Sequence, residues 1–377
     1  MLFFALYGTA LYGIILKNTY KGVIDMSYKD GIAAINLEMP DRVPRTEYSA
    51  ASHWELVKKV TGIDVSVSSD EETKTKAQQQ FFKAWSFDFL WNVNFNRSVF
   101  DNKRTDMGHA VYAAGGVDFS QNVGCPFNDT DEVLSLDFDK TYGVPDKKKL
   151  VEYLNECYKS TCLSHPDMVN MNGIYVTCMS GLIEILGWEM LLMTCGVDPD
   201  GFGDLANRYA KYMMPYYEAL AESEAPVIMI HDDIVWTEGA FIAPEWYRKY
   251  LFPNYKKMFA PIIEKQKKII YTSDGNYTEF IDDIADCNIN GFVLEPTTDM
   301  NYIAEKYGKT HAFIGNADTR ILLSGTKEDI YNEVKRCMDI GKKCPGFFMA
   351  VGNHIPANTP VDNALYYNEY YEKLSKR

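Results

Sequence analysis

Five short apolar segments of the chain each end in polar residues whose side chains can do acid–base chemistry or bind a metal. These polar groups are His231-Asp232-Asp233, Ser273-Asp274-Gly275-Asn276, Glu295-Pro296, Asn316-Ala317-Asp318 and Asn353-His354. A single aspartate or asparagine after a strand is commonly only the N-cap of the next helix. Five such endings in succession are hard to explain as caps alone, and Glu295 and His354 are poor capping residues. We therefore expect these residues to form one polar site.

The adjacent carboxylates Asp232 and Asp233 are the most direct candidates for acid–base catalysis. Two carboxylates that face one cavity raise the pKa of one of them, which can then act as a general acid or bind a cation. Successive residues of a strand point to opposite faces, so the sequence does not decide which aspartate faces the site. His231 could act in catalysis or could be a core histidine held by a neighbouring carboxylate. We name Asp232, Asp233, Glu295 and His231 as the catalytic candidates.

Eight apolar segments are predicted to be buried parallel strands, because they lack the polar alternation of a sheet exposed on one side. They cover residues 43–48, 87–93, 173–179, 226–231, 268–272, 291–294, 312–315 and 346–351. Amphipathic helical stretches between the later strands cover residues 198–221, 244–267, 277–286, 300–307 and 327–342. Strands that alternate with helices predict a parallel α/β sheet, and eight strands close a (β/α)8 TIM barrel. The polar groups at the strand ends then lie at the carboxyl-terminal mouth of that barrel.

A doubly wound open sheet is the rival α/β architecture. It is disfavoured because no GxGxxG motif lies between a predicted strand and a predicted helix. We therefore predict a single barrel over residues 26–377, with the weakly periodic segment 101–149 inserted over its mouth.

Residues 1–25 are predicted to be an apolar N-terminal extension of this barrel. Residues 2–16 are apolar apart from Thr9, but the stretch is shorter than the ~20 residues that span a bilayer. The basic region and the small-residue cleavage site of a signal peptide are both missing. The extension reflects an upstream start site or forms a helix packed on the domain, and we expect no membrane association.

Charge and cysteine content restrict the partners and the compartment. The 377 residues include 52 acidic and 38 basic ones, a formal net charge of −14, and no Lys/Arg-rich block, so no nucleic acid is expected as a partner. The eight cysteines form no CxxC pair and no Cys-His finger spacing, which suits reduced thiols in the cytoplasm. Aromatic residues make up 14% of the chain, and Trp236 is a candidate for stacking on a flat organic ligand.

Several motifs, taken together, resemble the uroporphyrinogen decarboxylase superfamily, which contains haem-pathway decarboxylases and corrinoid-linked methyltransferases. The motifs are PDRVPR (40–45), HDD (231–233) with FIAPEWYRKYLFP (241–253), SDGN (273–276), LEP (294–296), GNAD (315–318) and GNHIPANTPVDN (352–363). None of them would be specific alone. The resemblance runs from about Tyr28 to the C-terminus and implies a TIM barrel.

The sequence departs from the decarboxylase branch at two places. The decarboxylases carry an Arg-Gln-Ala-Gly-Arg-Tyr stretch whose arginines bind substrate carboxylates, where this chain has Arg45-Thr46-Glu47-Tyr48-Ser49-Ala50. They also hold the pyrrole NH groups with an aspartate, and this chain has Asn94 or Asn96 near that position. A neutral amide cannot stabilise a developing cation comparably. Decarboxylation of uroporphyrinogen is therefore the alternative function, not the first choice.

The methyltransferase branch often binds zinc through His-x-Cys and a later cysteine. This chain has Thr272-Ser273-Asp274 and Asn353 at those positions, so a thiol-type zinc site is not expected. Asp274, Glu295 and His354 still offer oxygen and nitrogen ligands from three strand ends, which suit zinc or another divalent metal. The same carboxylates could do acid–base work without a metal.

The resemblance implies an enzyme that moves a methyl group from a small methylated compound, such as an aryl methyl ether, to the cobalt of a partner corrinoid protein. That partner would bind the cobalamin, and no cofactor-binding motif is visible in this chain. Substrate contacts are expected from Asn94, Asn316, Asp318 and Trp236. A homodimer would be compatible with this role. An inactive barrel that acts as a binding subunit is the non-enzymatic alternative.

Overall fold

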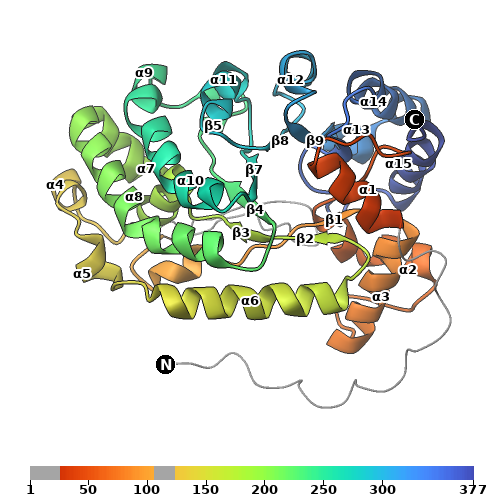
Figure 1. Cartoon of the computed structure of the whole chain (residues 1–377), viewed down its shortest axis with the longest axis horizontal. Helices are drawn as coiled ribbons and strands as arrows, with labels where there is room; N and C mark the ends of the chain where they lie inside the picture. Colours follow the sequence, from red (N-terminus) through yellow and green to blue (C-terminus); the bar gives the residue numbers. More distant parts are fainter. Residues whose placement is uncertain (1–25, 106–123) are drawn as a thin grey trace.

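Six parallel strands form the main sheet of the computed structural model, which describes residues 26–105 and 124–377 (Figure 1). In sheet order they are β10 (Phe347–Val351), β9 (Ala312–Ala317), β8 (Gly291–Val293), β7 (Lys268–Thr272), β4 (Val227–His231) and β3 (Asn172–Ile174). All but one of their residues are buried, which is why these segments are apolar on both faces. The predicted α/β fold with a parallel sheet is confirmed.

Two shorter strands form a separate pair next to β3. Strands β1 (Phe89–Leu90) and β2 (Val169–Asn170) pair in parallel, and β2 runs on into β3 after one intervening residue. The bridge between Phe95 and Ile174 continues the same pairing.

Residues 44–46 connect the two ends of this arrangement. The N–H of Met349 donates to the carbonyl of Pro44 at 2.8 Å, and the N–H of Asp88 donates to the carbonyl of Arg45 at 2.9 Å. Eight parallel segments therefore follow one another around a common interior. The segment at residues 44–46 makes one isolated bridge, between Arg45 and Met349, and not a regular ladder, so the ring of assigned strands is not continuous there.

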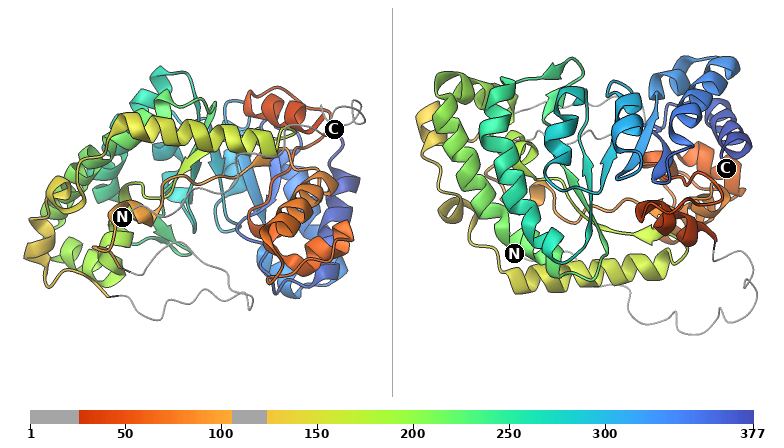
Figure 2. Two further views of the ribbon diagram at one scale, coloured as in Figure 1. Left: turned by 90° about the horizontal axis from the view of Figure 1, so that it is seen from below. Right: turned by 45° about the horizontal axis from the view of Figure 1, so that its top comes forward.

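Helices surround the strands on the outside, as Figure 2 shows. Those that follow the later strands are α7 (Cys178–Val197), α8 (Pro199–Glu222), α9 (Pro244–Trp246), α10 (Phe252–Glu264), α11 (Ile281–Ala285), α12 (Met300–Tyr307), α13 (Thr319–Ser324), α14 (Lys327–Gly341) and α15 (Val361–Leu374). The others are α1 (Met26–Ile35), α2 (Trp54–Thr61), α3 (Glu71–Ala84), α4 (Thr130–Leu134), α5 (Phe138–Tyr142) and α6 (Lys147–Ser164). A π-helical turn at Tyr247–Leu251 joins α9 to α10, so the stretch predicted at 244–267 is helical almost throughout.

Helix α7 is the main departure from the predicted elements. The strand expected over residues 173–179 ends at Ile174, and the helix begins at Cys178. The helix is buried on most of its circumference and has no polar face, so it lacks the amphipathic pattern by which helices are recognised. Among the described helices it alone has the length and apolar composition of a membrane span, but 78% of its most apolar stretch is buried inside the protein.

The described part of the predicted insertion packs on helices α7 and α8. Helices α4 and α5 both contact α8, and Arg208 donates a hydrogen bond to the carbonyl of Leu134 at 2.6 Å. The N–H of Thr105 donates to the carbonyl of Glu184 in α7 at 2.9 Å. Residues 106–123, and the whole predicted extension at 1–25, lie outside the described residues.

Candidate active site

Alternation along the strands decides which polar residues enter the barrel. Met229 of β4 belongs to the apolar cluster in the interior, whereas Ile230 packs in the larger cluster between strands and helices. The same period of two directs His231 inward and Asp232 outward. Of the adjacent aspartates, Asp233 therefore lies on the same side as His231.

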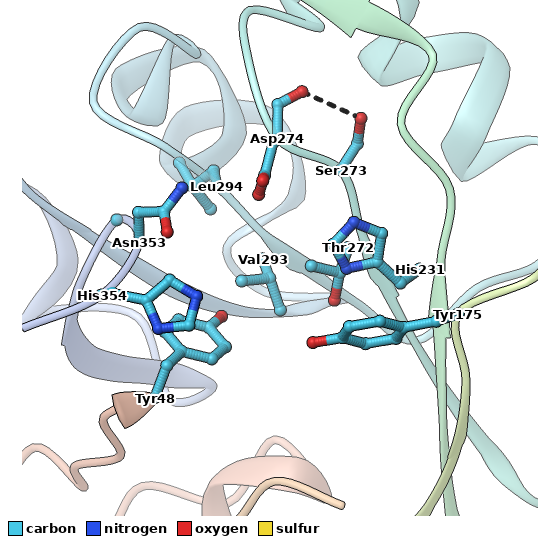
Figure 3. A pocket seen from close by; sticks show the side chains of 11 residues that line it. Tyr48, Tyr175, His231, Thr272, Ser273, Asp274, Val293, Leu294, Asn353 and His354 are labelled. Atoms are coloured by element: carbon cyan, nitrogen blue, oxygen red, sulfur yellow. Dashed lines mark hydrogen bonds between the residues drawn. The ribbon is translucent and has the colours of Figure 1, made fainter. Parts of the chain in front are cut away.

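A pocket of about 610 Å³, its open mouth included, lies at the carboxyl ends of these strands. Figure 3 shows side chains that point into it from several strand ends. The lining residues are Tyr48, Tyr175, His231, Thr272, Ser273, Asp274, Val293, Leu294, Gly352, Asn353 and His354. They offer a carboxylate, imidazoles, hydroxyls and an amide, and no lysine or arginine is among them.

His231, Asp233 and Asp274 form a compact group beside this pocket. One possible ligand atom of each lies within 4.8 Å of the others. Asp233 Oδ1 accepts a hydrogen bond from Nε2 of His231 at 2.8 Å and one from the backbone N–H of Asp274 at 3.0 Å. One carboxylate thus orients the imidazole and the loop after β7 together, and the set combines the nitrogen and oxygen donors that bind divalent metals.

The predicted metal set is Asp274, Glu295 and His354. Among the described residues, Asp274 forms a compact group of possible ligands with His231 and Asp233, and Glu295 and His354 are not members of that group.

Glu295 lies next to this group and connects two loops. Its carboxylate accepts a hydrogen bond from the N–H of Gly275 at 2.9 Å and another from the side-chain amide of Asn353. The loops after β7 and β10 are therefore held against the end of β8.

Asp232 lies outside the pocket. Its carboxylate accepts hydrogen bonds from the N–H groups of Met179 at 3.0 Å and Ser180 at 2.6 Å, in the first turn of α7, and from the hydroxyl of Tyr255 at 2.5 Å. Burial raises the pKa of Asp232 to about 6, and these donors oppose that effect by favouring the charged form. The structure thus uses Asp232 to hold α7 against β4 and does not bring it to the other catalytic candidates.

His354 faces the pocket from the side opposite His231 (Figure 3). Its ring contacts that of Tyr48, with centroids 6.0 Å apart. Burial, and less strongly the neighbouring His231, lower the pKa of His354 to about 4. The imidazole is therefore neutral at neutral pH.

This lowered pKa predicts a pH-dependent stability. The unfolded chain binds a proton at His354 below pH 6.5, whereas the folded protein does so only near pH 4, so the free energy of unfolding falls as the pH drops through this range. We expect a loss of about 2 kcal/mol, reduced from the full shift because the ring is partly exposed. Urea unfolding in EDTA across this range should show a shallower pH dependence for His354→Gln than for the wild type. Equal slopes would contradict the assignment.

Two of the predicted substrate contacts are asparagines that bond to the protein itself. The side-chain oxygen of Asn94 accepts from the N–H of Gly173 at 2.9 Å, which ties the segment after β1 to β3. Asn316 donates to the carbonyl of Glu295 at 3.2 Å and accepts from Arg336 at 3.0 Å. Neither asparagine lines the pocket.

The other two predicted contacts also lie elsewhere. Asp318 caps helix α13 and pairs with Arg320 at 2.6 Å, so it fits the simple capping interpretation. Trp236 lies on the hairpin of β5 (Val235–Trp236) and β6 (Gly239–Ala240), is 47% exposed, and packs against Trp188 and Phe241.

Sequence reasoning missed three pocket residues, Tyr48, Tyr175 and Thr272. Tyr175 is four residues after Met171, which faces the barrel interior, so alternation along the extended chain could have found it. In the sequence, Thr272 stands out only as a lost zinc ligand, and Tyr48 only as part of a missing arginine motif.

Arg45, the arginine that remains near the family's carboxylate-binding stretch, does not reach the pocket. Its guanidinium is fully buried, donates to Glu47 at 3.2 Å, and lies over the rings of Trp85 and Tyr371 at 4.3 and 4.7 Å. It therefore stabilises the packing of α15 and cannot serve as a substrate clamp.

A comparison with known protein families shows which family this chain belongs to. The sequence profile of the family described as Uroporphyrinogen decarboxylase (URO-D) matches residues 115–373. The chain belongs to this family.

Individual relatives include both branches. A uroporphyrinogen decarboxylase of Geobacter sulfurreducens is 24% identical over 213 residues, 56% of this chain and 61% of the relative. A methylcobamide:CoM methyltransferase of Methanosarcina acetivorans is 28% identical over 131 residues, 34% of this chain and 38% of the relative. The chain thus spans about three fifths or less of the length of these two relatives.

Among solved structures, a methyltransferase from Methanosarcina mazei has a similar fold. The TM-score is 0.61 at 16% identity, and the match covers 93% of this chain and 99% of the other.

Proposed function

We propose that the protein transfers a methyl group from a small methylated molecule, such as an aryl methyl ether, to the cobalt of a partner corrinoid protein. The observation that carries this proposal is the pocket itself, which has His231 and Asp274 in its lining, Asp233 bonded to both, and no lysine or arginine in its lining. Similarity to a methylcobamide:CoM methyltransferase supports it.

The chemistry of ether demethylation fits these groups. A reduced cobalt centre attacks the methyl carbon, the carbon–oxygen bond breaks, and the oxygen leaves with the bonding electron pair. That oxygen is a poor leaving group unless it is protonated or bound to a Lewis acid. His231 can supply the proton, because the carboxylate of Asp233 stabilises a positive charge on the imidazole through their hydrogen bond.

His231, Asp233 and Asp274 also fit zinc or another divalent ion, because their donor atoms are close together and of suitable types. A bound ion would supply Lewis acidity toward the departing oxygen. In that case His231, Asp233 and Asp274 would hold the ion, and the phenols of Tyr48 and Tyr175 would shape the substrate side of the pocket.

Uroporphyrinogen decarboxylation is the second candidate, favoured by the names of several relatives at 23–26% identity. Its substrate carries eight carboxylates, and the lining of the pocket contains no lysine or arginine to bind them. Arg45, the arginine that remains in the family's carboxylate-binding stretch, is buried and does not line the pocket.

Two assays on the purified protein separate these functions. With a methoxy-aromatic donor, free cob(I)alamin in place of the corrinoid protein should be converted to methylcobalamin, which is followed by the change in visible absorbance. With uroporphyrinogen, coproporphyrinogen should form no faster than in the absence of protein. Rapid decarboxylation without methyl transfer would reverse the choice.

A further inference from the structure

Two hydroxyl groups in the pocket are buried and without a hydrogen-bond partner among the described residues. They are Oη of Tyr48 and Oγ1 of Thr272. A buried hydroxyl without a partner costs free energy relative to one that is bonded, so such groups are normally satisfied by protein, water or ligand. Both residues line the pocket, and Figure 3 shows both hydroxyls directed toward its central space.

The pocket holds the carboxylate of Asp274 as well as these hydroxyls. In Figure 3 the carboxylate of Asp274 enters from one side of Val293, and the hydroxyls of Tyr48 and Thr272 lie on the other. The side chains of Val293 and Leu294 contribute apolar surface to the lining. A ring that lies on this surface can present one substituent to Asp274 and a second to the hydroxyls.

The charge of the pocket limits what that second substituent can be. Asp274 lines the pocket, Asp233 lies within the same compact group, and no lysine or arginine faces them from the lining. A carboxylate on the ligand would meet the two carboxylates, whose charge a protonated His231 offsets only in part. A divalent ion bound by the two aspartates would only offset their charge and would leave no excess to attract an anion.

We propose that the methyl donor is an uncharged aromatic ether that carries a separate hydroxyl group, and that this hydroxyl binds Tyr48 and Thr272. The inference rests on the proposed demethylation and adds the substrate class to it. Neutral hydroxyl groups both donate and accept, so a ligand hydroxyl is a suitable partner for both protein hydroxyls.

Equilibrium binding of small probes tests this without any methyl transfer. Calorimetry should compare the three isomeric methoxyphenols with methoxybenzene and with the three methoxybenzoates. We expect the best methoxyphenol to bind about tenfold more tightly than methoxybenzene, which corresponds to about threefold for each of the two hydrogen bonds. Each methoxybenzoate should bind more weakly than methoxybenzene.

Two variants assign the effect to the named hydroxyls. Tyr48→Phe and Thr272→Val remove one hydroxyl each with little change of shape, and each should reduce the advantage of the methoxyphenol to less than about threefold while methoxybenzene binds as before. Tyr250→Phe is the matched control, because its hydroxyl bonds to Asp200 at 2.7 Å on the surface, and it should keep the full advantage. Far-UV circular dichroism checks that each variant folds, and either of the two pocket variants suffices for the test.

Equal affinity of methoxybenzene and every methoxyphenol, tighter binding of a methoxybenzoate, or no binding of any probe would overturn the inference. An advantage that survives in both pocket variants would do so as well. If the wild type shows the expected discrimination but no probe methylates cob(I)alamin, the proposed function fails and the binding inference stands. If methoxybenzene and the methoxyphenols bind equally and both methylate cob(I)alamin, the binding inference fails and the proposed function stands.

Discussion

Replacing Asp274 by alanine is expected to lower the rate of methyl transfer to cob(I)alamin by about a thousandfold. Asp274 is the member of the compact group with His231 and Asp233 whose carboxylate lines the pocket directly. It is needed whether the group holds a divalent ion or moves a proton. Loss of one ligand from three would also remove most of the metal affinity, so metal content measured on the same preparations should fall if an ion is bound.

The fold should tolerate this change. Asp274 is only partly buried, and its backbone N–H keeps its hydrogen bond to Asp233 when the side chain is removed. Removal of one of two neighbouring carboxylates also relieves repulsion between like charges. Thermal unfolding should therefore show a melting temperature equal to or above that of the wild type.

Asp299→Ala is the matched control for Asp274→Ala. Asp299 also follows a strand, but it is exposed and caps helix α12 through the N–H of Tyr302 at 3.0 Å. Its loss should cost about 1 kcal/mol of stability and leave methyl transfer intact. Full activity of Asp274→Ala, or loss of activity in the control alone, would contradict the assignment of the chemistry to the end of β7.

Replacing Asp232 by alanine is expected to destabilise the protein by about 3–5 kcal/mol, whereas the same change at Asp233 should cost about 1 kcal/mol. Asp232 is fully buried and accepts hydrogen bonds from Met179, Ser180 and Tyr255. Without its carboxylate these donors remain buried and unsatisfied, and the start of α7 loses its acceptor. Urea unfolding followed by circular dichroism measures both variants.

Activity should not follow stability in these variants, because the more stable Asp233→Ala is the one expected to lose methyl transfer. Asp233→Ala leaves α7 in place but releases His231 from its hydrogen bond, so it should fold and lose methyl transfer. Asp232→Asn keeps one acceptor oxygen and should restore part of the stability lost in Asp232→Ala. A stable but inactive Asp232→Ala together with an active Asp233→Ala would contradict this assignment and would give Asp232 the role in catalysis.

The sequence alone determined the class of fold and the position of the site along the chain. Buried parallel strands are apolar on both faces, so their segments could be located from composition, and β7 and α12 have the predicted bounds. The site follows from the same reasoning, because the carboxyl ends of parallel strands in a barrel share one rim. The positions of His231 and Asp274 at the carboxyl ends of two apolar segments were therefore enough to predict that both residues share one polar site.

Only the tertiary structure decided which of the neighbouring polar residues act together. Asp232 and Asp233 have the same chemistry and adjacent numbers, but the start of α7 satisfies the first and His231 contacts the second. The helix responsible has no polar face, so its boundary could not be predicted from periodicity.

The remaining pocket residues come from distant parts of the chain. Tyr48 and His354 are more than three hundred residues apart and their rings meet only because residues 44–46 pair with β10. Asn94, Asn316 and Asp318 had the right chemistry, but their side chains already bind other groups of the protein. These groups are the N–H of Gly173 for Asn94, Arg336 for Asn316 and Arg320 for Asp318. The sequence specifies which groups are available at the strand ends, and long-range packing decides which of them are satisfied within the protein and which face the ligand.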